Sequence, residues 1–325
     1  MRSAADRGCP PVDRSRTRTL LLPVLAALAA AAAAPGAHGS QIVARNAEDV
    51  RLHVDGAGRA VVEYVVEGRP RVVVASDAID ALPPASGRPQ VRFTLDYSGR
   101  SAQSRRRLLG AFANGCRRYD GPALVWLVAA CNAPDGSYWA LQRWQRLQPM
   151  RGIDPWLPRH RAVELHLSHW SGPLPLLEVS PNWTYGGAWQ ALFGRLTYRG
   201  APVHRPAHLP RGRGNPYIRY FYIDTYNSAY GPGWKRDAAK ATHVPNGAFC
   251  YSFVPQQPPP GYPTRQFRGP GHGERHRVTV MGPGVTPIVQ WEGRGLGPFN
   301  PAVDELFNTV FDRFLSGDPV CTRER

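Results

Sequence analysis

Lysine is nearly missing from this chain of 325 residues. Lys and Arg together number 40 against 24 Asp and Glu, for a net charge of +16, yet Lys235 and Lys240 are the only lysines. The arginines are scattered, and only Arg105 to Arg107 form a run. A nucleic-acid-binding surface needs its basic residues clustered on one face. We therefore attribute the charge to the composition of a GC-rich genome and expect no nucleic-acid partner, while attraction to anionic wall polymers or phospholipid head groups stays open.

The common catalytic signatures are absent as well. The chain has no Gly-x-Ser-x-Gly elbow, no phosphate-binding Gly-x-x-x-x-Gly-Lys-Ser/Thr loop, no His-Glu-x-x-His and no Gly-x-Gly-x-x-Gly. It also has no Cys-x-x-Cys pair of the kind that holds zinc. These absences lower the expectation of an enzyme without excluding one, because diverged families lack such motifs. We expect no metal and no cofactor.

One apolar segment lies near the amino terminus, and it is too short for a membrane span. An arginine-rich stretch from Arg2 to Arg18 precedes the apolar run Leu20 to Ala34, and small residues follow up to Ser40. A span needs roughly 20 apolar residues, whereas this pattern is typical of a cleavable signal peptide. We predict a signal peptide over residues 1–39 and a secreted, extracellular or envelope-associated protein without a transmembrane anchor. The alternative is an uncleaved membrane helix.

Cysteine is scarce, and its number fits export. Cys9 belongs to the predicted signal peptide, which leaves Cys116, Cys131, Cys250 and Cys321 in the mature chain. Four cysteines in an oxidising compartment indicate two disulfides, with three possible pairings. We favour Cys116 with Cys131, which flank a short local excursion, and Cys250 with Cys321.

Short alternating segments separated by Gly and Pro predict a mainly β protein with antiparallel, sandwich-like sheets. Residues 40–100 read as an N-terminal meander, and residues 101–325 as a larger β-rich part that could form one domain with it. Further strands are expected at 124–131, 137–145, 162–170, 176–180, 191–199, 218–226, 247–254 and 277–281. A short helix is expected at 104–113. Asn300 and Pro301 begin a C-terminal amphipathic helix, whose apolar stripe we expect to pack on a sheet.

The best candidates for acid/base chemistry lie in the segment from Val163 to Trp170. On a strand, Glu164, His166 and Ser168 share one face, with His169 on the other. Such a row could provide general acid/base groups, and Asp224 is a further carboxylate for a glycosidase. The alternative is a solvated face, since neighbours on one strand are roughly 7 Å apart, too far for short side chains to hydrogen-bond directly.

A candidate binding surface follows about 50 residues later. Tyr220, Tyr222, Asp224 and Tyr226 share one face of a predicted strand, and Trp234 follows shortly after it. Aromatic rings stack on the apolar faces of sugars while neighbouring polar groups bond the hydroxyls, so this pattern predicts a sugar-binding surface. The alternative is that these rings build the core of a β protein.

Several stretches resemble a group of exported proteins from high-GC bacteria, over most of the mature chain. They are residues 119–131, 133–142, 164–170, 192–198 and 227–236. The resemblance implies export and disulfides, and it brings no activity, ligand or site residues. We therefore expect a secreted, non-catalytic binding or envelope-associated protein, with an extracellular or wall glycan as its leading ligand. The alternatives are a secreted hydrolase of a wall or extracellular polymer, and a purely structural protein.

Overall fold

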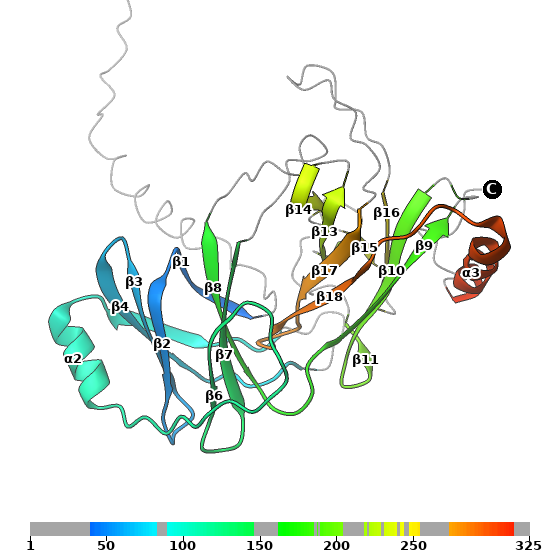
Figure 1. Cartoon of the computed structure of the whole chain (residues 1–325). Helices are drawn as coiled ribbons and strands as arrows, with labels where there is room; N and C mark the ends of the chain where they lie inside the picture. Colours follow the sequence, from blue (N-terminus) through cyan, green and yellow to red (C-terminus); the bar gives the residue numbers. More distant parts are fainter. Residues whose placement is uncertain are drawn as a thin grey trace, which may run out of the picture. The chain divides into compact units, whose positions relative to one another are not determined.

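The structure is a computed structural model, and the parts of the chain it describes are scattered along the sequence. They are residues 40–82, 90–145, 162–184, 187, 189–203, 218–219, 221–228, 231–238, 241–243, 247–253 and 273–314. The predicted signal peptide 1–39, Tyr220 and Cys321 lie outside these residues. Within the described ranges, no helix has the length and apolar character needed to cross a membrane. Figure 1 shows the arrangement of the elements along the chain.

In the region of the predicted N-terminal meander, the chain forms a four-stranded antiparallel sheet in the order β2-β3-β4-β5. Its strands are β2 (Glu48–Val54), β3 (Ala60–Val66), β4 (Arg69–Ser76) and β5 (Thr94–Gly99). β3 and β4 are joined by Glu67 and Gly68, both at positive φ, as a two-residue hairpin turn requires. Helix α2 (Ala102–Gly110) follows, and Ser101 and Ser104 cap its first turn reciprocally.

A second antiparallel sheet has the order β1-β8-β7-β6. It consists of β1 (Gln41–Arg45), β6 (Leu127–Asn132), β7 (Tyr138–Gln145) and β8 (Val163–Trp170). The predicted hairpin between β6 and β7 is present, with Gly136 at φ +84°. β1 was not predicted. One apolar cluster combines Val62 and Val73 of the first sheet with Trp139, Leu141 and Leu167 of the second. These two sheets therefore pack on each other as in a sandwich.

The third sheet has six strands. Five of them follow the order β11-β10-β16-β15-β12, and the sixth, β9, pairs with β10 outside this order. Its strands are β9 (Leu176–Thr184), β10 (Trp189–Tyr198), β11 (Ala201–Pro202), β12 (Ile218–Arg219), β15 (Ala241–His243) and β16 (Ala248–Phe253). Leu192, Leu196 and Phe249 of this sheet share an apolar cluster with Phe221 and Val278 of the fourth.

The fourth sheet carries the candidate binding residues and has the order β14-β13-β17-β18. It consists of β13 (Phe221–Ser228), β14 (Gly231–Ala238), β17 (Arg275–Met281) and β18 (Ile288–Arg294). All three pairings are antiparallel. With this sheet, the prediction of a mainly β fold with antiparallel sheets and a C-terminal helix is confirmed.

The C-terminal helix α3 (Pro301–Phe314) begins where predicted, with the Asn300 side chain accepting from the Ala302 amide. Helix α3 contacts β9 of the third sheet, but the four side chains of its apolar stripe that the structure describes are exposed. Val303, Leu306, Phe307 and Val310 are between 47 and 66 % exposed. The segment before the helix adds to the contact with the third sheet: the Phe299 ring meets the Trp183 ring of β9, and the Gly297 carbonyl accepts from the Trp183 indole nitrogen.

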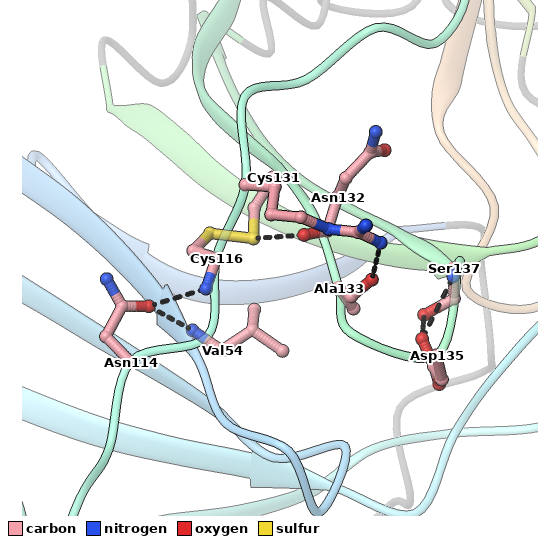
Figure 2. Close-up of a disulfide and its surroundings, with 9 residues drawn as sticks. Val54, Asn114, Cys116, Cys131, Asn132, Ala133, Asp135 and Ser137 are labelled. Carbon is pink, nitrogen blue, oxygen red and sulfur yellow. Dashed lines mark hydrogen bonds between the residues drawn. A yellow bond between two sulfur atoms is a disulfide. The ribbon is translucent and has the colours of Figure 1, made fainter.

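The predicted disulfide between Cys116 and Cys131 is present, with 5.4 Å between the two Cα atoms (Figure 2). Beside it, the Asn114 side chain accepts hydrogen bonds from the amides of Cys116 and Val54. The bridge thus fastens the loop after α2 to β6, and Asn114 fastens the same loop to β2. Cys250 lies in β16 and Cys321 lies outside the described residues, so that second pairing stays a prediction.

Candidate functional site

The predicted sugar-binding residues fall into two groups on the fourth sheet. Tyr222 and Asp224 are buried, at 0 and 2 % exposed, whereas Tyr226 and Trp234 are only partly buried. The core alternative therefore holds for Tyr222, which joins an apolar cluster with Trp144 and Met281. Of the predicted rings that the structure describes, Tyr226 and Trp234 are the two that solvent, and hence a ligand, reaches.

Tyr226 and Trp234 are cross-strand partners on β13 and β14. Their ring centroids are 5.2 Å apart with an interplanar angle of 57°. This pairing follows from the hairpin register, because directly opposed residues of an antiparallel pair project from the same face. The two rings therefore form one composite aromatic surface at the edge of the sheet.

Two arginines of β17 contact this pair of rings. The Arg275 guanidinium lies 4.5 Å from the Tyr226 centroid and 5.4 Å from that of Trp234. The Arg277 guanidinium lies 4.2 Å from Trp234 and 5.8 Å from Trp126, which precedes β6. These distances are within the range of cation–π attraction. We call Trp126, Tyr226, Trp234, Arg275 and Arg277 the arginine-aromatic surface.

The buried side chain of Asp224 holds Arg277, one of the arginines of this surface, in position. Its carboxylate accepts from Nε and Nη2 of Arg277 at 3.0 and 2.8 Å, and it is ion-paired with Arg236 of β14. Arg236 is itself stacked over the Tyr222 ring at 4.8 Å. Both carboxylate oxygens of Asp224 thus accept from arginines of the neighbouring strands. Asp224 positions guanidinium groups, and a ligand resting on the sheet meets Trp234 and the arginines first.

Sequence reasoning missed Arg275, Arg277 and Trp126 as members of this surface. A signal for the arginines was present, since Arg275 and Arg277 alternate with the buried residues His276 and Val278. Their strand partners, however, lie about 50 residues earlier in the chain. Trp126 sits at φ +52° just before β6 and stacks on Trp144 of β7 with 5.2 Å between centroids, a position that local patterning does not reveal.

The acid/base candidates of β8 lie in the interior. Glu164, His166 and Ser168 are 5, 0 and 0 % exposed, so the alternative of a solvated face is wrong. The expectation that neighbours along the strand are too far apart to bond is also wrong for one pair, since Nε2 of His166 lies 3.2 Å from Oε2 of Glu164. Glu and His side chains are long enough to lean toward each other along the strand.

The same pair reaches the first strand. Arg45 donates from Nε to Glu164 at 3.3 Å, and the Ser40 hydroxyl lies 3.2 Å from Nδ1 of His166. Nδ1 also lies 3.1 Å from the Ser40 carbonyl oxygen, so it accepts from the Ser40 hydroxyl in one tautomer and donates to the Ser40 carbonyl in the other. This Ser-His-Glu row resembles a nucleophile with its base and orienting carboxylate, but its members are buried. In the structure it fastens β1 to β8.

His169, on the opposite face of β8, is a buried neutral histidine. Its Nδ1 bonds the Ala78 carbonyl at 2.5 Å, its Nε2 lies 2.8 Å from the Ser137 hydroxyl, and its ring stacks on Trp139 at 3.8 Å. Burial is the main cause that lowers the pKa of His169 to about 4. This histidine is part of the packing between the sheets.

Within the described ranges, no cluster of three or more His, Cys, Asp or Glu side chains could hold a metal ion. Comparisons with protein-family models, with curated proteins and with solved structures find no match to this chain. The functional argument therefore rests on the geometry of the site alone.

Proposed function

We propose that the protein is a non-catalytic carbohydrate-binding protein of the extracellular space or cell envelope, and that it binds an extracellular or wall glycan on the arginine-aromatic surface. The observation that carries this proposal is the partly exposed pair Tyr226 and Trp234, held at the edge of a sheet by Arg275 and Arg277. Rings fixed in this way meet a ligand with little loss of side-chain entropy.

The rigidity of the surface supports binding as its role. Arg277 is pinned by two hydrogen bonds to Asp224, and Trp234 is packed against both Tyr226 and Arg277. A sheet face with its side chains locked by neighbours is preorganised, which favours affinity. The disulfide between Cys116 and Cys131 supports an oxidising location, because such bridges persist outside the cytoplasm.

The second candidate function is hydrolysis of a wall or extracellular polymer through Glu164 and His166. The 3.2 Å contact between them favours it, since a carboxylate that bonds an imidazole holds the ring in a fixed orientation, as in a nucleophile–base–carboxylate arrangement. Asp224, the third candidate, bonds arginines of the fourth sheet instead. Because His166 is fully buried on the face of the second sheet that it shares with Gln142 and Trp144, a substrate would reach it only if the elements packed on that face moved away.

The test is calorimetric titration of the exported protein with soluble wall glycans and common polysaccharides, with product analysis of the same mixtures. Saturable binding without product is expected. Trp234→Ala should weaken binding about tenfold or more, because it removes the central ring. Tyr97→Ala is the matched control, since Tyr97 is an exposed ring on β5 of another sheet.

Two results would contradict the proposal. Binding that Trp234→Ala leaves unchanged would place the ligand elsewhere on the molecule. Product release that survives in Trp234→Ala and disappears in Glu164→Gln would establish the hydrolase in its place.

A further inference from the structure

The register of the fourth sheet arranges the candidate surface in rows. The first row crosses all four strands as Trp234, Tyr226, Arg275 and Arg294. The second row is Arg236, Asp224, Arg277 and Glu292. Because opposed residues share a face, the two rows lie side by side on one face of the sheet.

The two rows differ in charge. The second row holds two arginines, one Asp and one Glu, so its formal charges cancel. The first row holds two rings and two arginines without an acid, for a formal charge of +2. Arg275 is 44 % exposed along its side chain, and its one described ion pair is a 2.8 Å contact with Glu292 of the second row. The excess positive charge is therefore on the row that carries the accessible rings.

We infer that the ligand of this surface is an acidic polysaccharide whose carboxylate or phosphate groups bind Arg275 and Arg294 while its sugar rings contact Tyr226 and Trp234. The inference rests on the proposed glycan-binding function and names the class of glycan. A guanidinium stacked on a ring keeps its N–H donors in its own plane, directed away from the ring, where they fit the two oxygens of a carboxylate or phosphate.

The dimensions of the row fit a polymer better than a single sugar. Neighbouring strands lie about 4.8 Å apart, so a row across four strands extends over roughly 14 Å. This length accommodates several consecutive sugar units, with the rings at one end of the row and the two arginines at the other. A ligand with regularly spaced anionic groups would contact both.

The experiment measures binding of the exported protein to three polymers of matched length: polygalacturonate, poly(glycerol phosphate) and neutral dextran. Both acidic polymers should bind at least about tenfold more tightly than dextran, and their affinity should fall as salt rises. Comparison of the two acidic polymers distinguishes a carboxylate from a phosphate ligand.

The double variant Arg275→Gln/Arg294→Gln should remove the preference for acidic polymers, while Trp234 keeps its contacts with Tyr226 and Arg277. The double variant Arg51→Gln/Arg69→Gln is the control, because both residues are exposed on the first sheet and the same net charge is removed. It should keep the preference.

The failures of the two proposals are distinguishable. Equal affinity for dextran and the acidic polymers, with Trp234→Ala still harmful, would overturn the acidic ligand and leave glycan binding in place. Absence of binding to any polymer would remove support from both. Tighter binding to single-stranded DNA or to anionic phospholipid vesicles than to polygalacturonate would also overturn the inference.

Discussion

The Arg277 guanidinium lies 4.2 Å from the Trp234 ring centroid while donating two hydrogen bonds to the buried Asp224 carboxylate. One arginine therefore links the accessible aromatic surface to the interior of the fourth sheet. The ring and the carboxylate were both predicted from the sequence as ligand-contacting groups. In the structure the ring is accessible, and the carboxylate holds the arginine against it.

Replacing Asp224 should be costly to stability. Asp224→Asn removes the negative charge to which Arg236, which is 4 % exposed, and part-buried Arg277 are both bonded. Removing one partner of a buried ion pair costs roughly 3–5 kcal/mol, so the free energy of unfolding should fall by about that amount. Urea denaturation measures it. Glu292→Gln is the control in the same sheet, because its pair with Arg275 is exposed and should contribute less than about 1 kcal/mol. Equal losses in the two variants would contradict this assignment.

The stability of the protein should fall on acidification through His169. The folded-state pKa of His169 is lowered from 6.5 to about 4, mainly by burial, so between these pH values the unfolded state binds a proton that the folded state excludes. The contribution is fully present above pH 6.5, and the free energy of unfolding should fall by about 1.4 kcal/mol per pH unit below it. Urea denaturation at several pH values gives the slope.

His169→Gln removes the titrating group and should flatten this pH dependence, whatever its effect on stability at neutral pH. The readout is the slope between pH 6.5 and 4, which a loss of packing against Trp139 alone would not change. A slope identical in the variant and the wild type would assign the pH dependence to other groups.

The disulfide should stabilise the fold by constraining the unfolded chain. Cys116 and Cys131 are separated by 15 residues, and closing a loop of that size contributes about 3 kcal/mol. The double variant Cys116→Ser/Cys131→Ser should therefore lose about that amount in chemical denaturation. Peptide mapping without reduction tests the bridge directly and also decides whether Cys250 pairs with Cys321. A bridge from Cys131 to another cysteine would contradict the structure.

The strands that sequence patterning located are those with a strong alternation of apolar residues. β3, with the sequence AVVEYVV, is an inner strand of its sheet and lies within the meander predicted for residues 40–100. β14, with the sequence GPGWKRDA, was not predicted as a strand, and it begins with Gly and Pro, which are typical of turns. It is an edge strand, and Pro is tolerated there because an edge strand forms backbone hydrogen bonds on one side only. Its strand conformation therefore comes from pairing with β13.

In the candidate site, too, the sequence predicted the residues that lie close together in the chain and missed those that distant segments contribute. The partnership of Tyr226 and Trp234 depends on the local hairpin of β13 and β14, and both rings were identified from the sequence. Arg275 and Arg277 reach those rings through pairing with β17, far along the chain, which a single sequence does not specify. The burial of Glu164 and His166 likewise depends on distant segments, because Trp144, on the same face of the second sheet, packs with residues of the fourth sheet.

The exposed stripe of α3 gives a prediction that separates the two interpretations of this helix. Leu306 is 66 % exposed, so Leu306→Gln should change the free energy of unfolding by no more than about 0.5 kcal/mol, as for most surface substitutions. If the stripe belonged to the core, as the sequence pattern indicated, the loss would be comparable to that of Leu196→Ala. Leu196 is fully buried in β10, and its truncation should cost about 2–5 kcal/mol. Urea denaturation of both variants decides between a free and a packed helix face, because a large loss for Leu306→Gln would show that another part of the chain covers it.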